Sequence, residues 1–144
     1  MNARRRIAVG LLSAAFVSST VVLAEPASAG EYCSSGYHCV FYADIGTSKH
    51  SYFDSDSNFT NDYFGNGAVV NDNFESASNS STGGYESHYY YDINYGGGLV
   101  FCVNPGHTVH ASQLTNDWVA GNHSAQQNEG SSLRLRPTTT ITCF

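Results

Sequence analysis

The sequence is poor in charge, and above all in positive charge. Charged residues make up 12% of its 144 positions, about half of the ~25% that soluble domains usually carry. Six basic and twelve acidic side chains give a net charge of −6, so the chain has no electrostatic attraction for phosphate backbones. This scarcity argues against a helical bundle held by surface ion pairs, and we expect no nucleic-acid partner.

The N-terminus has the three parts of a secretory signal peptide. Three arginines at positions 4–6 form a basic start, residues 7–23 are an apolar run, and Ala27-Ser28-Ala29 supplies a cleavage site. The apolar run is short for a membrane anchor, and no later segment is apolar enough to span a bilayer. The sequence therefore predicts a signal peptide over residues 1–29 and a secreted, extracellular chain over 30–144 with no membrane partner.

The mature segment has few aliphatic residues but many aromatic ones. Its 115 positions hold 21 Leu, Ile, Val and Phe residues, no methionine, and three basic against eleven acidic side chains, for a net charge of −8. Eighteen aromatic residues, ten of them tyrosine, can bury large rings while a tyrosine hydroxyl reaches water or a partner. A core this thin favours a small, loop-rich β domain that depends on covalent cross-links.

Periodicity in the mature segment is that of strands. No stretch keeps apolar residues at a helical spacing over three turns, whereas short runs alternate with period two. Turn residues such as Asn66-Gly67 and Asn104-Pro105-Gly106 separate these runs. Eight strands are expected, which favours a sandwich or barrel, at residues 37–42, 51–54, 68–70, 87–91, 99–103, 108–114, 132–136 and 138–143.

A short internal repeat divides the domain. Tyr42-Ala43-Asp44-Ile45 and Tyr90-Tyr91-Asp92-Ile93 share three letters in register at an offset of 48 residues, and each precedes a turn and a strand. Each half is too small to fold alone. We therefore expect one domain over 30–144, built of halves at about 32–82 and 83–144 that share one core, with a polar linker near 80–84.

Four cysteines lie in the exported segment, and four cysteines allow three connectivities. Cys33 and Cys39 enclose a short loop in which Gly36 permits a tight turn, so we expect them to pair and leave Cys102 for Cys143. Export favours disulfides, and neither a C-x-x-C motif nor a close Cys/His cluster supports zinc.

The hairpin from Tyr90 to Gly97 is similar to the Greek-key signature of βγ-crystallins, in which two aromatic residues with four residues between them are followed by any residue and a glycine. The whole layout resembles the secreted small metalloproteinase inhibitors of actinobacteria, peptidase inhibitor family 36, over about residues 32–136. The signal peptide, the opening Cys33-Ser34-Ser35-Gly36-Tyr37-His38-Cys39-Val40, an Asn-Asp turn, a Tyr-rich hairpin and a later Cys-Val dipeptide carry this resemblance.

The resemblance implies a fold and a function. The fold would be an all-β, disulfide-stapled βγ-crystallin-like sandwich of two Greek-key motifs. The function would be that of a monomeric, secreted, non-enzymatic inhibitor of a protease, with a thermolysin-like metalloprotease favoured, acting by loop insertion. The alternatives are a calcium-stabilised structural β domain and a secreted antimicrobial or envelope-binding protein, for which exposed rings of the Tyr89-Tyr90-Tyr91 run would be suited.

The family's reactive dipeptide maps onto Cys102-Val103. The expected inhibitory loop is therefore Cys102, Val103, Asn104 and Pro105, in which Pro105 limits flexibility and the disulfide holds one end. The family closes this loop with a nearby second cysteine, whereas here the partner would be distant Cys143. The alternative is that Cys102 and Val103 belong to a stapled core strand.

Three segments resemble the βγ-crystallin calcium motif, (N/D)-(N/D)-x-x-(S/T)-S, and each is incomplete: residues 116–121 keep only the opening Asn-Asp pair. Residues 71–76 have Glu75 at the hydroxyl position, and residues 127–132 begin with a glutamine. Either they bind calcium weakly through oxygen ligands, or their polar side chains bond local backbone. The candidate ligands are Asn71, Asp72, Glu75, Ser76, Asn128 and Ser131, and no other cofactor is expected.

Catalytic signatures are missing. Two of the six histidines, His107 and His110, are three apart, but no H-E-x-x-H or G-x-S-x-G motif is present. With all cysteines oxidised, no thiolate nucleophile remains. We therefore expect a protein that is not an enzyme.

Overall fold

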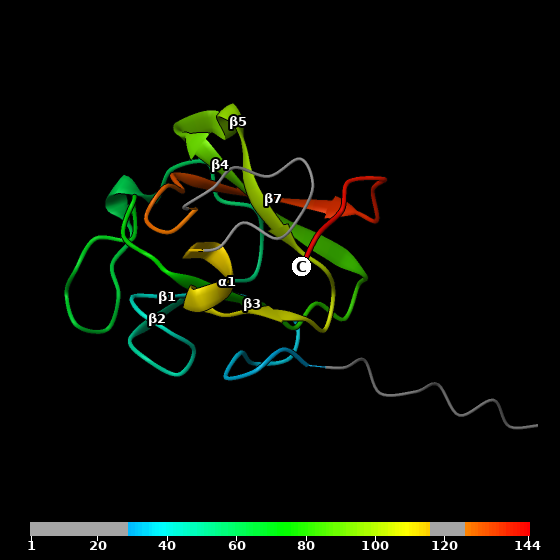
Figure 1. Ribbon diagram of the computed structural model, residues 1–144, viewed down its shortest axis with the longest axis horizontal. Coiled ribbons are helices and arrows are strands. Elements are labelled where there is room, and N and C mark those ends of the chain that lie inside the picture. The colour runs from blue at the N-terminus through cyan, green and yellow to red at the C-terminus, as the bar shows by residue number, and fades with distance from the viewer. Residues whose placement is uncertain (1–28, 116–125) are drawn as a thin grey trace, which may run out of the picture.

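The computed structural model describes residues 29–115 and 126–144, so most of the expected signal peptide, residues 1–28, lies outside the described residues. The described residues form two antiparallel sheets (Figure 1), which confirms the all-β prediction. The first sheet has the order β2 (Lys49–Tyr52), β1 (His38–Phe41), β3 (Ser76–Asn79) and β6 (Thr108–Val109). The second has the order β5 (Gly96–Val103), β4 (Tyr85–Asp92) and β7 (Ser132–Pro137). Short helices are η1 (Phe59–Asn61), η2 (Ile93–Tyr95) and α1 (Ala111–Thr115).

Each sheet receives a segment from the other half of the chain. β6 follows β5 in sequence but pairs with β3, through Ala77 opposite Val109. In the same way Asp56, which follows β2, bridges to Leu133 of β7, with hydrogen bonds of 2.8 Å and 2.7 Å between their backbones. This exchange ties the two sheets together.

The core between the sheets is mainly aromatic. Phe74, Tyr89 and Phe101 are fully buried, and their ring centroids lie 4.7–6.1 Å apart, the range in which aromatic pairs attract each other. Tyr89 therefore points inward, while Tyr90 and Tyr91 are half-buried. The tyrosine run supplies no fully exposed ring.

One expected strand in the first half is wrong, and one strand there was not expected. Residues 68–70 form only an isolated bridge between Val69 and Tyr63, whereas the strand itself is β3. The four side chains of β3 are small and buried, and all but Ala77 are polar, so no apolar alternation marked them. Hydrogen bonds satisfy them: the Ser76 hydroxyl donates to the Ala43 carbonyl at 2.7 Å, and the Asn79 amide donates to Val103 at 2.9 Å.

Two expected strands in the second half are also wrong. The expected strand at 108–114 ends at Val109, and α1 follows. His110 precedes this helix, and its backbone N–H donates to the Gln113 side chain at 2.8 Å, which resembles half of a capping box. Residues 138–143 form no strand, because Thr139 is bonded to the Glu86 carboxylate instead.

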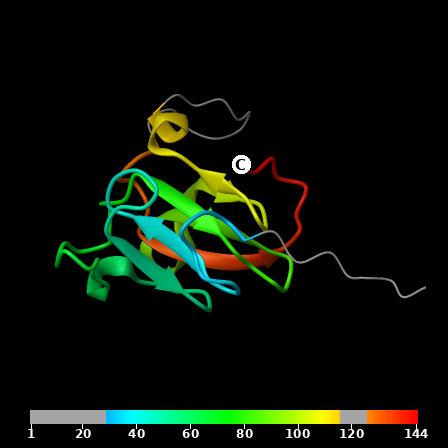
Figure 2. The ribbon, with the colours of Figure 1, turned by 90° about the horizontal axis from the view of Figure 1, so that it is seen from below.

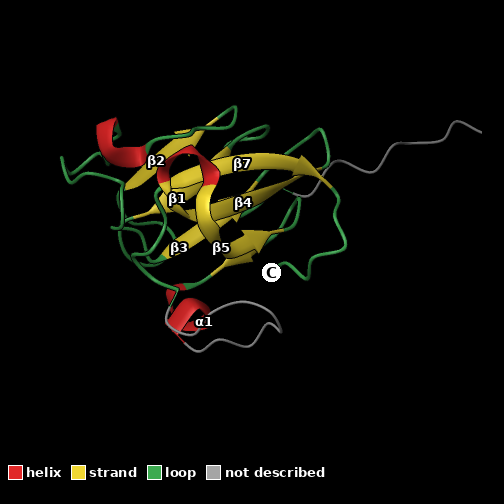
Figure 3. Cartoon of the chain, turned by 90° about the horizontal axis from the view of Figure 1, so that it is seen from above, coloured by secondary structure: helices red, strands yellow, loops and turns green. Residues whose placement is uncertain are grey.

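α1 lies beside the sheets rather than between them, as Figures 2 and 3 show. Its Leu114 nevertheless reaches the core and is fully buried. No helix in residues 29–115 and 126–144 has the length and apolar character needed to cross a membrane.

Candidate functional site

The expected inhibitory loop begins inside the core. Cys102 and Val103 are the last residues of β5, pair with His88 and Ser87 of β4, and are completely buried. The Val103 carbonyl also accepts a hydrogen bond from the Asn79 amide at 2.9 Å. In this conformation neither side chain can contact a partner protein. Their placement is that of the alternative in which Cys102 and Val103 belong to a core strand held by a disulfide.

The surface part of this segment is the turn at residues 104–107. Asn104 and Pro105 are half-buried, and His107 is exposed. The turn is held on both sides: Gly106 N donates to the Asn79 carbonyl at 2.8 Å, and Asn104 N donates to the Phe144 carbonyl at 2.8 Å. The result is a hydrogen-bonded, constrained turn.

Both expected disulfides are present, Cys33–Cys39 and Cys102–Cys143. The second fixes the C-terminal segment beside the end of β5, where Phe144 N donates to the Cys102 carbonyl at 3.0 Å. The Asn104 side chain adds a bond to the Cys143 carbonyl at 3.1 Å. The C-terminus thus supports the turn from one side.

Residues 116–121 lie outside the described residues, and the two calcium-like segments at 71–76 and 127–132 lie crosswise against each other. Asp72 N donates to the Gly130 carbonyl at 3.0 Å, and Asn128 N donates to the Phe74 carbonyl at 2.8 Å. Asp72 and Asn128 occupy the same motif position and have similar φ angles, 51° and 58°. The Ser131 hydroxyl consequently donates to the Asp72 carboxylate at 3.0 Å. Glu75 is the residue after Phe74, so the same contact places Glu75 next to the segment that contains Asn128.

The other candidate ligands divide into two groups. The Asn71 Oδ1 atom is buried and has no hydrogen-bond partner in the described residues, although its amide donates to Asp72. Ser76 is used elsewhere, since its hydroxyl donates to Ala43. The structure therefore brings Asn71, Asp72 and Ser131 together and separates Ser76 from them.

Buried polar pairs occur on both faces of β4. On the outer face, His88 Nε2 donates to the Glu86 carboxylate at 2.7 Å, and Thr139 donates to it twice. Burial alone would raise the pKa of Glu86, but these hydrogen bonds outweigh it and hold the pKa below its usual range. On the inner face, the Ser87 hydroxyl and His38 Nδ1 share a bond of 2.6 Å. Ser87 is fully buried, so no substrate can reach this hydroxyl.

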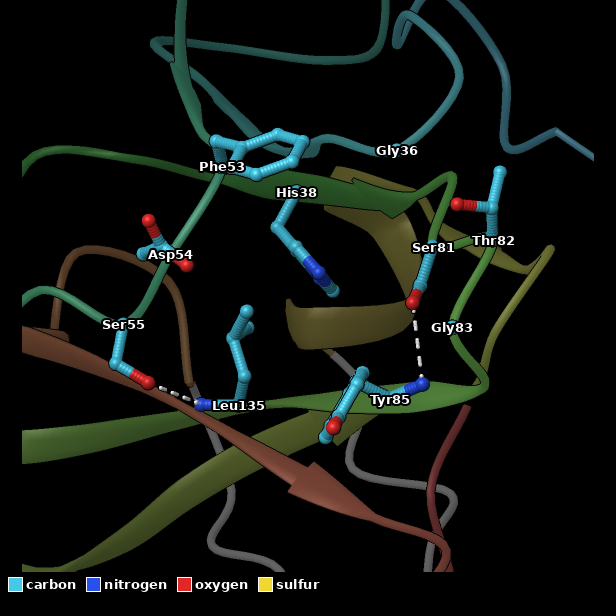
Figure 4. A pocket seen from close by; sticks show the side chains of 10 residues that line it. All are labelled: Gly36, His38, Phe53, Asp54, Ser55, Ser81, Thr82, Gly83, Tyr85 and Leu135. Atoms are coloured by element: carbon cyan, nitrogen blue, oxygen red, sulfur yellow. Dashed lines mark hydrogen bonds between the residues drawn. The ribbon is translucent and has the colours of Figure 1, made fainter.

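A cleft of about 410 Å³ opens between the two sheets, and sequence reasoning missed it. Figure 4 shows Phe53 on one side, Tyr85 and Leu135 on the other, and the His38 ring between them. The remaining lining residues are Gly36, Asp54, Ser55, Ser81, Thr82 and Gly83. Because these residues come from separate segments, no local motif marks them.

His38 makes the fold sensitive to acid. Burial lowers the pKa of His38 from 6.5 to about 4, since the charged ring would lose its water. Between these two pH values the unfolded chain binds a proton that the folded chain does not. The free energy of unfolding therefore falls as the pH falls from 6.5 to 4, by about 3 kcal/mol in total.

His38→Asn, which can keep a polar contact to Ser87, should remove this loss of stability at acidic pH. Urea unfolding at pH 7 and pH 4 should show a pH dependence about 3 kcal/mol smaller than in wild type. His107→Asn, at an exposed ring, is the control and should leave the pH dependence unchanged. An unaltered pH dependence in His38→Asn would show that other groups carry it.

The comparisons with known proteins identify one family. A family model described as peptidase inhibitor family I36 matches residues 26–102. The matched segment includes the opening disulfide loop and β4, and it ends at Cys102. No curated protein and no solved structure matches the chain.

Proposed function

The chain belongs to peptidase inhibitor family I36, and on this premise we propose that it is a secreted inhibitor of a thermolysin-like metalloprotease that acts by inserting a surface loop. The family match over more than half of the chain is the observation that carries the proposal, and it implies a protease as partner. Members of a peptidase inhibitor family are generally not enzymes.

The turn at residues 104–107 is the part of the expected loop that can contact a protease. A protease cleft holds its ligand in a fixed shape, so a loop that is already ordered loses less entropy on binding. Bonds from Gly106 to Asn79 and from Asn104 to Phe144 order this turn, and Pro105 restricts it further. We propose that Asn104 and Pro105 enter the cleft, while Cys102 and Val103 anchor the turn from inside the core.

Inhibition constants against a thermolysin-like enzyme test this proposal. Pro105→Arg should weaken inhibition at least tenfold, about 1.4 kcal/mol, because a long charged side chain replaces a compact ring at the contact. Asn61→Arg, at an exposed residue of η1, should inhibit as wild type does, and melting temperatures should be equal. Wild type without any inhibition at micromolar concentration would refute the function, whereas a fully active Pro105→Arg would refute only the site.

We also propose that the sheets have the βγ-crystallin-like arrangement of two Greek-key motifs. The exchanged segments support it: β6 of the second half joins the first sheet, and Asp56 of the first half joins β7. The two calcium-like segments support it as well, because each donates a backbone hydrogen bond to the other across the two halves.

A second candidate function, calcium-dependent stabilisation, is favoured by the contact between Asp72 and Ser131. Calcium prefers six to eight oxygen ligands, and Asp72, Ser131 and the unpartnered Asn71 Oδ1 place three such oxygens in one region. Asn128 and Glu75 occupy the motif positions of Asp72 and Ser131 in the opposite segments, so they would form the corresponding second pair of ligands. The site lacks a full ligand set, so we propose weak binding.

Calcium should bind with a dissociation constant of about 10⁻⁴–10⁻³ M. At 10 mM calcium and a 1 mM constant, mass action adds about 1.4 kcal/mol to the free energy of unfolding. Asp72→Ala should remove this gain in thermal melts, while Asp54→Ala, at an exposed carboxylate outside both segments, should keep it. A micromolar isotherm by calorimetry would show a complete site, and no calcium-dependent shift at 10 mM would refute binding.

A further inference from the structure

The cleft between the sheets has the composition of a ligand site. Its floor is the His38 ring, which is 1% exposed and whose Nδ1 is bonded to Ser87. The ring lines the cleft (Figure 4), and its other nitrogen, Nε2, has no hydrogen-bond partner among the described residues. A polar atom placed in this way at the bottom of a cleft is available to a bound molecule.

The walls add several neutral hydrogen-bonding groups. The Ser55 hydroxyl accepts from Leu135 N at 2.9 Å and the Ser81 hydroxyl accepts from Tyr85 N at 3.1 Å, so both hydroxyl protons remain to be donated. Thr82 adds a third hydroxyl at the rim. Asp54 is the only charged side chain in the lining. Such a set suits a ligand that carries many hydroxyl groups.

Two aromatic rings face this polar set. Phe53 is 62% exposed and Tyr85 is 45% exposed, so both rings leave apolar surface open to a ligand. Tyr37 holds the Phe53 ring in an edge contact at 5.4 Å between centroids, so the ring is kept in place before any ligand arrives. Exposed, ordered rings beside hydroxyl groups match the two faces of a sugar ring, with its C–H bonds against the aromatic surface and its hydroxyls against polar groups.

We propose that this cleft binds the pyranose ring of a neutral oligosaccharide. Phe53 and Tyr85 pack against the C–H faces of the sugar, and the hydroxyls of Ser55, Ser81 and Thr82 with His38 Nε2 bond its hydroxyl groups. None of the residues that line the cleft belongs to the proposed protease contact at residues 104–107. Binding of such a sugar would hold the secreted protein on extracellular glycan and so retain the inhibitor at the envelope.

A cationic peptide side chain is the competing ligand. It could stack on Phe53 and pair with Asp54, but it would leave the three hydroxyls and the imidazole without partners. His38 is neutral near pH 7, because burial lowers its pKa to about 4. The neutral polar groups outnumber the single carboxylate, and this favours the sugar.

The test is an amide-shift titration of the mature protein by NMR. Chitotetraose, cellotetraose and maltotetraose are each added to about 10 mM, which detects millimolar dissociation constants. At least one should shift the amides of Gly36, Thr82 and Gly83 in a saturable way. Phe53→Ala should weaken that binding at least tenfold, about 1.4 kcal/mol. Tyr63→Ala, which removes a ring that is 60% exposed but outside the cleft, should bind as wild type does.

Three results would overturn the proposal: no saturable shift with any of the three sugars, binding that Phe53→Ala leaves intact, or saturable shifts of the same amides with arginine amide in place of sugar. Inhibition of the protease is measured on the same variants. Phe53→Ala should inhibit normally, so a failure of the sugar site and a failure of the inhibitory function give different outcomes.

Discussion

Val103→Asp should destabilise the fold severely. Val103 is completely buried at the end of β5, and a carboxylate there would have no cationic partner. A buried, unpaired charge costs more than about 4 kcal/mol, a large part of the 5–15 kcal/mol that stabilises a typical domain. Circular dichroism should show no cooperative thermal transition, or one lowered by more than about 15 °C.

Val103→Ala separates the two roles considered for this residue. It removes two methyl groups from the core, so it should lower the free energy of unfolding by about 1–3 kcal/mol while leaving a folded protein. If Val103 only anchors the turn, the folded variant should inhibit as wild type does. An unchanged melting temperature with a hundredfold loss of inhibition would instead place Val103 in the protease contact.

Strands with one exposed face were predictable from sequence. In β7, Leu133 is buried and its neighbour Arg134 is exposed, as the alternation of leucine and arginine indicates. β4 and β5 were also located, with their ends displaced by a few residues, although four consecutive residues of each strand are buried on both faces. Alternation is informative in β7 because one side of the strand meets the core and the other meets water.

β3 gave no such signal because its side chains are small and three of the four are polar. Ser76, Ala77, Ser78 and Asn79 are all buried, and hydrogen bonds to other segments replace the apolar contacts that periodicity detects. For α1 a signal existed in His110 and Gln113, but a helix of five residues is too short to show a period.

The candidate sites were predictable to different degrees. The spacing within residues 71–76 and 127–132 identified two calcium-like segments, but their crosswise contact through Asp72 and Gly130 depends on the tertiary structure. The Cys102-Val103 dipeptide was found by resemblance, which cannot tell a surface loop from the buried strand before it. His38 in the cleft gave no signal, because its neighbours there come from distant parts of the chain.

Loss of the Cys102–Cys143 disulfide should cost about twice as much stability as loss of the Cys33–Cys39 disulfide. The two bridges span 41 and 6 residues of sequence. Closing a loop of the larger size removes about 4 kcal/mol of chain entropy from the unfolded state, against about 2 kcal/mol for the smaller. Urea unfolding of the two double variants, Cys102→Ala with Cys143→Ala and Cys33→Ala with Cys39→Ala, measures the difference.

The position of the long bridge adds a second effect to chain entropy. The C-terminal segment that it fixes also supplies Thr139, whose backbone and hydroxyl both bond the buried Glu86 carboxylate. Without the bridge this segment can leave the sheet, and Glu86 and His88 become accessible to water. Hydrogen exchange at the Thr139 amide should therefore accelerate in Cys102→Ala with Cys143→Ala and stay slow when only Cys33 and Cys39 are replaced. Equal losses of stability, with Thr139 protected in both variants, would show that the C-terminal segment is held by its hydrogen bonds alone and that the bridge adds nothing to its attachment.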